Sequence, residues 1–203
     1  PPSSPPPPPP AAPAAAKPVP AVRYKGAGWS VVVPGSYKRM STEKPRKIYP
    51  PRPGVSCEPD CRDLQSKRTE ETPLVARFGS TDYVQDISVS MRGANTLKLS
   101  FLQIKDVAEF GDVNEALPLF LPPGVTVNSA VARTTPAGAD GSPEKNYYIY
   151  DFQFGIARVL LTAAIEMGNV YLLGATADAA KWAESEKEFQ RASKSFRVGV
   201  EAA

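Results

Sequence analysis

Hydrophobic and polar residues alternate along much of this chain. In the C-terminal third, apolar residues recur at every second position, which is typical of β-strands with one buried face. This pattern predicts strands over residues 148–154, 159–165 and 170–176, the last two joined as a hairpin by a turn at 167–169. Earlier in the chain, the same pattern predicts strands over residues 22–33, 74–78, 87–91, 97–104 and 125–133.

Two segments have helical signals instead. Asp112 followed three residues later by Glu115 is a capping-box pattern, and it predicts a short helix over residues 115–121 that the Pro-Pro-Gly at 122–124 ends. Asp178 is a candidate N-cap for a longer helix that reaches about residue 194.

That longer helix carries aromatic residues at a spacing of seven. Trp182, Phe189 and Phe196 therefore form one stripe, which we expect to pack in the core as the apolar faces of amphipathic helices do. Together these elements predict an α+β domain with a central antiparallel sheet of about six strands and helices packed on it.

The N-terminal residues have no such periodicity. Of the 23 prolines, 11 lie in the first twenty positions. Proline and alanine at this density predict an extended arm over residues 1–21, because polyproline II has no internal hydrogen bonds and buries little surface. A spacer is the favoured role, with a PxxP ligand as the alternative. The folded domain is then residues 22–203, within which residues 36–73 form a long loop rich in proline.

Charge is divided unevenly along the chain. Residues 1–68 hold 12 Lys and Arg against 4 Asp and Glu, and residues 69–203 hold 12 against 17. A basic segment on an acidic body favours docking on an anionic partner, with a solubilising role as the alternative. Nucleic acid fits poorly, because the basic residues lack interleaved aromatics and the acidic body repels phosphate. The candidate partner-binding residues are the six cations Lys38, Arg39, Lys44, Arg46, Lys47 and Arg52.

Composition excludes several classes of enzyme. The chain has no histidine, so it holds no Ser-His-Asp or Cys-His catalytic centre and no His-ligated metal. The carboxylate pairs available for acid-base chemistry are Asp82 with Asp86 and Asp151 with Glu166, and solvated charges at strand ends are the favoured interpretation of both.

A pigment or small-ligand carrier would need an apolar pocket. Tyr148, Phe152 and Phe154 could line one, although core packing is favoured. No apolar run is long enough to span a bilayer.

The two cysteines, Cys57 and Cys61, flank a Glu-Pro-Asp turn inside the long loop. A disulfide ranks first, because a spacer of three residues allows the required approach of the two Cα atoms in an oxidising compartment. Two free thiols rank second, and a catalytic thiol ranks third because no base is at hand. A zinc site is a weak alternative that would need carboxylate ligands such as Glu58 or Asp60.

Several segments resemble the PsbP family of extrinsic photosystem proteins and their thylakoid-lumen relatives. The opening Tyr-Lys-Gly-Ala-Gly-Trp-Ser-Val-Val-Val-Pro at 24–34 is similar to the start of that domain, and residues 78–91, 112–115 and 147–152 resemble its following segments in order. The tail is the strongest match: Val-Tyr-Leu-Leu-Gly-Ala at 170–175, then Trp182, then Ser-Phe-Arg-Val at 195–198. The resemblance covers residues 22–200.

The resemblance implies an α-β-α sandwich, a location in the chloroplast thylakoid lumen peripheral to the membrane, and a presequence before Pro1. It implies a non-catalytic role on the lumenal face of a photosystem, with the oxygen-evolving side of photosystem II favoured. There, PsbP supports retention of calcium and chloride. The alternatives are an assembly or accessory role at photosystem I or another thylakoid complex, and lumenal small-ligand binding. The long basic insertion and the missing histidines depart from PsbP itself, and the chain resembles a divergent, algal PsbP-domain protein that holds no cofactor or metal of its own.

Overall fold

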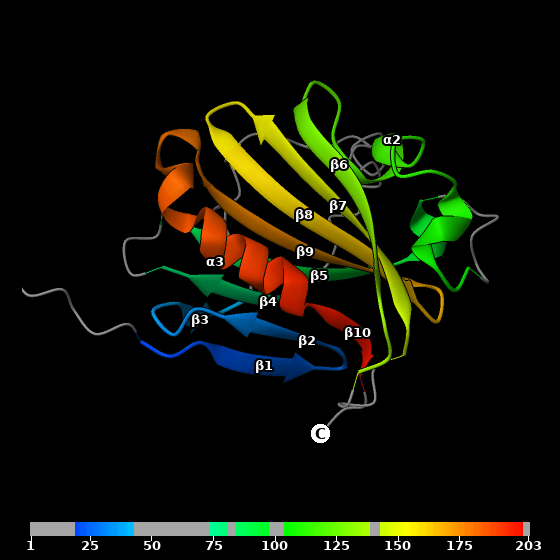
Figure 1. The fold of residues 1–203 in the computed structure, drawn as a ribbon, viewed down its shortest axis with the longest axis horizontal. Helices are drawn as coiled ribbons and strands as arrows, with labels where there is room; N and C mark the ends of the chain where they lie inside the picture. The colour runs from blue at the N-terminus through cyan, green and yellow to red at the C-terminus, as the bar shows by residue number, and fades with distance from the viewer. Residues whose placement is uncertain (1–18, 43–73, 81–83, 98–103, 139–142, 201–203) are drawn as a thin grey trace, which may run out of the picture.

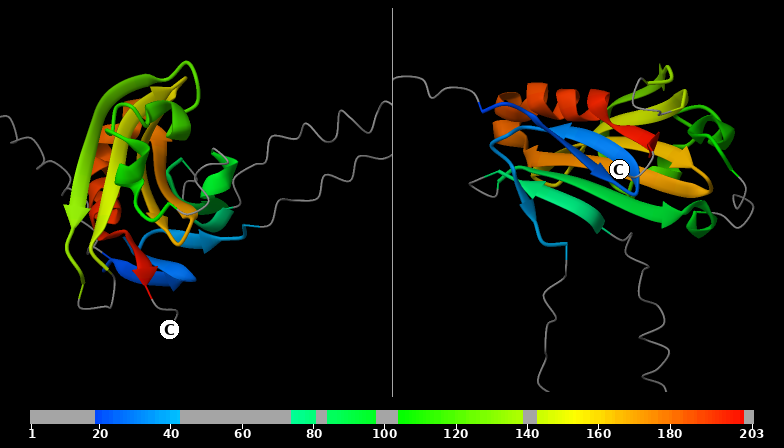
Figure 2. Two further views of the ribbon diagram at one scale, coloured as in Figure 1. Left: turned by 90° about the vertical axis from the view of Figure 1, so that its right-hand side faces the viewer. Right: turned by 90° about the horizontal axis from the view of Figure 1, so that it is seen from below.

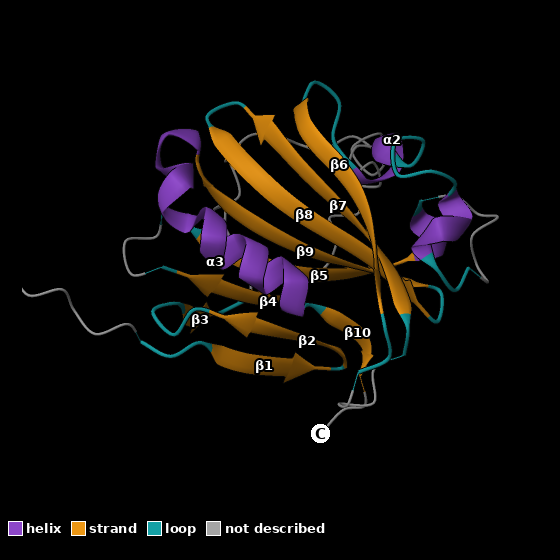
Figure 3. Cartoon of the chain, in the orientation of Figure 1, coloured by secondary structure: helices purple, strands orange, loops and turns teal. Residues whose placement is uncertain are grey.

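The computed structural model describes residues 19–42, 74–80, 84–97, 104–138 and 143–200. Within these ranges the chain forms ten strands in two antiparallel sheets, one long helix and several short helical turns (Figure 1, Figure 3). The fold class is the predicted α+β, but the main sheet is larger than expected. It has seven strands in the order β3-β4-β5-β9-β8-β7-β6, and a separate sheet has the order β1-β2-β10.

The strands of the larger sheet are β3 (Lys38–Met40), β4 (Leu74–Gly79), β5 (Asp86–Gly93), β6 (Thr126–Thr135), β7 (Lys145–Phe154), β8 (Ala157–Glu166) and β9 (Asn169–Asp178). Those of the smaller sheet are β1 (Val22–Gly26), β2 (Gly28–Val33) and β10 (Arg197–Val200). The helical segments are η1 (Ala94–Thr96), η3 (Val107–Phe110), α2 (Leu117–Phe120), η4 (Ala179–Lys181) and α3 (Trp182–Ser195).

Most of the strands predicted from alternation are confirmed, and the hairpin between β8 and β9 is the clearest case. Glu166 pairs with Asn169 across a turn of two residues, Met167 and Gly168, both of which have positive φ. This geometry matches the right-handed twist of the two strands, as in a type I′ turn.

The single strand predicted over residues 22–33 is wrong, because the chain turns back on itself at Ala27 to form β1 and β2. Gly28 has a φ of 77°, and a Cβ at this position would lie 2.7 Å from the hydroxyl oxygen of Tyr171. Glycine is therefore required by both backbone conformation and close packing. Trp29, Val31 and Val33 are buried as predicted, but Ser30 between them is buried as well, so β2 does not have one buried and one exposed face.

Two other predictions need correction. Leu97 and Ile104, the ends of the strand predicted over 97–104, lie in no strand, and residues 98–103 are outside the described ranges. The helix predicted over 115–121 is shortened to the four residues of α2. The capping pattern before it does form, because Asp112 accepts from the N–H of Asn114 and Glu115 accepts from the N–H of Asp112, but it closes a turn instead of starting a long helix.

The larger sheet is covered on both faces. Seen edge-on, it has α3 on one side and the segment containing η3 and α2 on the other (Figure 2, left). One core cluster packs α3 and the smaller sheet against the first face, and a second cluster packs residues 94–97 and 104–121 against the other. Trp182, Phe189 and Phe196 are all buried in the first cluster, as predicted, although Phe196 lies just beyond the end of α3 in extended backbone and not on the helix itself. Asp178 accepts from the N–H of Ala180 and caps the turn that leads into α3.

Candidate functional site

The basic segment begins on strand β3, at one edge of the larger sheet. Lys38 and Arg39 are exposed there, opposite Gly79 and Phe78 of β4. Neither forms an ion pair with a carboxylate among the described residues. Four of the predicted partner-binding residues lie outside the described ranges. Both cysteines also lie outside them, as does Glu58, which was considered as a zinc ligand. The structure therefore places two of the six cations together on a short strand, within the segment 36–73 that was predicted to be loop, and that prediction is wrong at residues 38–40.

Three of the four carboxylates considered for catalysis are described, and each forms an ion pair. Asp151 on β7 accepts two hydrogen bonds from the guanidinium of Arg158, at 2.9 and 2.6 Å, and a third from the side-chain amide of Asn128 at 3.0 Å. Burial raises the pKa of the Asp151 carboxyl, but the hydrogen bonds from Arg158 and Asn128 outweigh it and hold that pKa below its ordinary value. The hydrogen bonds to Asp151 raise the pKa of Arg158. The Arg158 guanidinium also lies 4.6 Å from the centre of the Trp182 ring, so this pair holds the start of α3 on the sheet.

Glu166, the carboxylate considered together with Asp151, is the last residue of β8. Its Oε2 is 2.6 Å from Nζ of Lys145, a mostly buried lysine. Asp151 pairs with Leu160 across β7 and β8, six residues along β8 from Glu166. The two carboxylates considered as a catalytic pair therefore do not share a site.

Asp86, the partner considered for Asp82, forms an ion pair with Arg77 of the neighbouring strand at 2.5 Å. Residue 82 lies outside the described ranges. A metal site is equally unsupported in the described part of the chain, where no three Asp, Glu, Cys or His side chains lie together.

The tyrosines of β7 fasten the segment that leads into α2. Tyr150 donates to the carbonyl of Val113 at 3.0 Å, and Tyr148 donates to the carbonyl of Gly111. Burial raises the pKa of both phenols, and the Asp112 carboxylate adds to the rise. Tyr148 and Phe152, predicted as candidate lining of a ligand pocket, are core residues, whereas Phe154 is 54% exposed.

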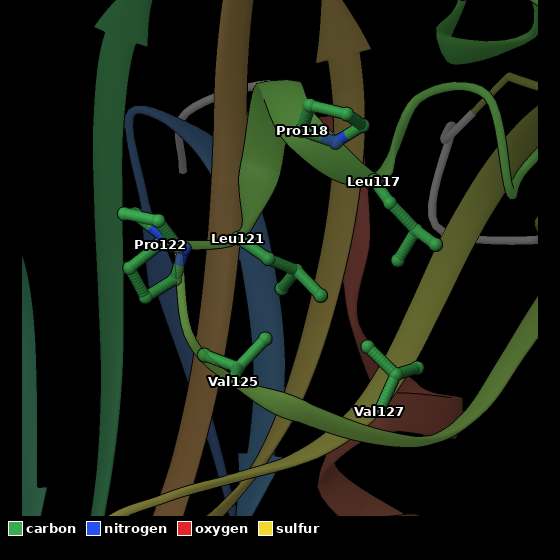
Figure 4. A pocket seen from close by; sticks show the side chains of 7 residues that line it. Leu117, Pro118, Leu121, Pro122, Val125 and Val127 are labelled. Atoms are coloured by element: carbon green, nitrogen blue, oxygen red, sulfur yellow. The ribbon is translucent and has the colours of Figure 1, made fainter.

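A different set of residues lines a groove. It has a volume of about 310 Å³ and lies between α2 and the start of β6 (Figure 4). Its walls are the aliphatic and proline side chains of Leu117, Pro118, Leu121, Pro122, Pro123, Val125 and Val127. This groove was not predicted from the sequence. The available signal was charge, because residues 116–132 contain no Asp, Glu, Lys or Arg in a chain that is 22% charged.

Arg133 was not predicted from the sequence as a residue with a specific role. Its guanidinium donates to the carbonyl of Ser193 at 3.1 Å and lies 5.0 Å from the centre of the Tyr147 ring. Burial, with Arg197 nearby, lowers the pKa of Arg133. These contacts tie the end of β6 to the C-terminal turn of α3, so Arg133 serves the fold.

Comparison with known proteins identifies the fold. No protein-family model matches the sequence, and no curated protein matches it. Among solved structures, the solution structure of cyanobacterial PsbP (CyanoP) from Synechocystis sp. PCC 6803 matches with a TM-score of 0.57. The match covers 93% of this chain and 98% of that chain at 12% sequence identity.

The chain therefore has a PsbP-like α+β fold, as its motifs predicted. At this level of identity the likeness concerns the fold, and function needs separate support. None of the described helices is long and apolar enough to cross a membrane.

Proposed function

We propose that this protein is a non-catalytic extrinsic subunit or auxiliary factor that docks on the lumenal face of a photosystem, on the oxygen-evolving side of photosystem II. The observation that carries this proposal is the PsbP-like fold, which extends over nearly the whole chain. The order of the sequence motifs resembles the same family and adds support from independent evidence.

The docking element in this proposal is the basic segment of Lys38, Arg39, Lys44, Arg46, Lys47 and Arg52. These six cations lie within fifteen residues that contain a single acidic residue, Glu43. Lys38 and Arg39 project from a sheet edge into solvent, where a charged partner can reach them. Such a cluster attracts an acidic surface over roughly 8 to 10 Å at ordinary ionic strength.

The proposed role is to stabilise the complex and to support retention of its calcium and chloride ions from the thylakoid lumen, where the protein is peripheral to the membrane. The ions belong to the partner complex in this proposal. Catalysis has no place in it, and the ion pairs of Asp151 and Glu166 agree with this, because both carboxylates are committed to structural contacts.

The test is binding of the full chain to isolated complexes stripped of extrinsic proteins. Photosystem II and photosystem I are assayed side by side, with and without the charge reversals Lys44→Glu, Arg46→Glu and Lys47→Glu. The proposal expects salt-sensitive binding to photosystem II that the triple variant loses. A matched control reverses three exposed cations on the acidic body, Lys181, Lys187 and Arg191, for the same change in net charge.

Circular dichroism confirms that each variant is folded. Equal weakening by the two triple variants would show that net charge alone matters and would contradict the assignment to the basic segment. Binding to photosystem I in preference to photosystem II would transfer the proposal to that complex. Binding to neither complex would overturn it.

A further inference from the structure

The two edges of the larger sheet differ in a way that bears on binding. β3, at one edge, has three residues and carries Lys38 and Arg39. Short edge strands with lysine discourage pairing with another chain. β6, at the opposite edge, has ten residues, and β7 is its single strand partner in the described part of the chain (Figure 1).

The β6 edge lacks charge along most of its length. From Thr126 to Ala132 the sequence has no charged residue and no proline, and most of these side chains are exposed. Every second residue of an edge strand directs its N–H and C=O away from the sheet, so β6 offers to an incoming strand backbone donors and acceptors that no other described strand pairs. A bulge between Val127 and Ser129 is the one irregularity of its pairing with β7.

The apolar groove is continuous with this edge. Val127 belongs to β6 and also lines the groove, so an added strand that pairs near this residue has an apolar depression beside it. Val127 lies opposite Phe152 of β7. Phe154, two residues further along β7, lies on the same face of the sheet, and its ring is exposed.

We propose that the β6 edge and the groove together bind an extended, uncharged segment of a partner polypeptide. The segment adds to the larger sheet as an eighth strand beside β6 and places one aliphatic side chain in the groove. Main-chain hydrogen bonds supply the affinity in this mode of recognition, and pockets for alternate side chains supply the specificity. The absence of charge over residues 116–132 selects against charged segments, because an unpaired charge would lose its hydration there.

A second copy of this chain is a poorer fit to the groove. Beyond Val127, which lines its own groove, β6 presents Ala130 and Ala132 on the groove face, opposite Tyr150 and Tyr148. Alanine side chains are too small to fill a groove of about 310 Å³. The proline-rich first 21 residues are also unsuitable, because proline has no N–H to donate to a strand.

The test uses a phage library of random peptides of about twelve residues, long enough to cover an edge strand, selected on the full chain. We expect enriched peptides with an uncharged, proline-free stretch that contains an aliphatic residue. The most enriched peptide is then synthesised with single N-methyl groups along its backbone. Methylation should weaken binding by about tenfold at alternate positions and have little effect between them, because an added strand points every second N–H towards β6.

Two matched variants distinguish the loss of an apolar contact in the groove from the effect of changing any valine of β6. Val127→Thr places a hydroxyl in the groove and should weaken the peptide about fivefold or more. Val131→Thr makes the same change on the same strand, but Val131 lies opposite Ile149 on the α3 face and is 52% exposed, so the affinity should stay the same.

Failure to enrich any peptide would overturn the proposal, as would equal responses to the two variants or a methylation profile without alternation. Sedimentation of the chain alone tests whether a second copy of the chain binds the β6 edge instead. A dimer that Val127→Thr dissociates would assign the edge to a second copy instead. None of these outcomes depends on photosystem binding, so this inference and the proposed function stand or fall separately.

Discussion

The Nζ of Lys145 lies 2.6 Å from Oε2 of Glu166 and also donates to the backbone carbonyl of Lys105 at 3.1 Å. Lys145 begins β7 and Glu166 ends β8, so the pair joins one end of the two neighbouring strands, and the third contact fastens the segment before η3 to them. Both side chains are mostly buried, with 10% and 20% of their surfaces exposed. An ion pair in this setting is sensitive to loss of one partner.

We expect Lys145→Met to lower the free energy of unfolding by about 2 to 4 kcal/mol, because it leaves the Glu166 carboxylate without its counter-charge in a mostly buried position. The double variant Lys145→Met with Glu166→Met should recover most of this loss, since an apolar pair carries no desolvation penalty. Urea unfolding of the single and double variants measures both values. A double variant as unstable as the single one would show that packing, and not charge, dominates here.

The aromatic stripe of α3 should be indispensable, in contrast to the N-terminal arm. Phe189 is fully buried and packs against Trp182 with ring centres 5.3 Å apart. Phe189→Ala should cost about 3 to 5 kcal/mol through lost burial and the resulting cavity. The exposed neighbour Gln190→Ala and deletion of residues 1–21 should each change stability by less than about 0.5 kcal/mol. Thermal unfolding of the three proteins tests this, and a large loss on deleting the arm would contradict the domain boundary at residue 22.

Alkaline pH should destabilise the fold through its buried tyrosines. Burial raises the pKa of Tyr147, Tyr148, Tyr150 and Tyr171 above the ordinary value. The unfolded chain therefore releases these protons from about pH 10 upward while the folded chain keeps them, so the stabilising effect is complete below that pH and is lost as pH rises further. Each such tyrosine contributes a fall of up to about 1.4 kcal/mol per pH unit.

Urea unfolding at several pH values between about 9 and 11 measures this slope, and tyrosinate absorbance shows whether ionisation accompanies unfolding. Tyr150→Phe, which removes the hydroxyl bonded to Val113, should make the slope shallower by one residue's contribution. Full ionisation of the tyrosines in a protein that remains folded would be the contrary result.

Cys57 and Cys61 should form a disulfide in the mature protein. Their spacing of three intervening residues is compatible with a short closed loop, and its contribution lies at the low end of about 2 to 4 kcal/mol because the entropy lost on closing a small loop is small. Intact mass after alkylation, with and without reduction, gives the answer. Two thiols that alkylate without reduction in protein taken directly from its compartment would rule the bond out.

The local sequence pattern was sufficient to predict strands and turns where the strands alternate regularly and the turns are short. The hairpin of β8 and β9 and the stripe of Trp182, Phe189 and Phe196 were predicted because each depends on residues close in sequence. The strand predicted over 22–33 failed at Ala27, because the Gly-Ala-Gly at 26–28 was not recognised as a hairpin turn. The close approach of Tyr171 to Gly28, a contact distant in sequence, could not be predicted locally. Solvated charges at strand ends were the favoured interpretation of Asp151 and Glu166, whereas both side chains are mostly buried and form ion pairs with Arg158 and Lys145.

By itself, the sequence determined the α+β class, the concentration of proline in the first twenty residues, the separation of basic and acidic halves, and the motif order that resembles PsbP. These follow from composition and from periodicities that each segment carries alone. Tertiary structure alone decided which strands form the two edges of the larger sheet in the described part of the chain, and hence that Lys38 and Arg39 lie on one edge and the mostly uncharged β6 forms the other. Strand order arises from pairing between distant segments, and β6 borders the groove because α2 packs beside it. No local pattern encodes either arrangement.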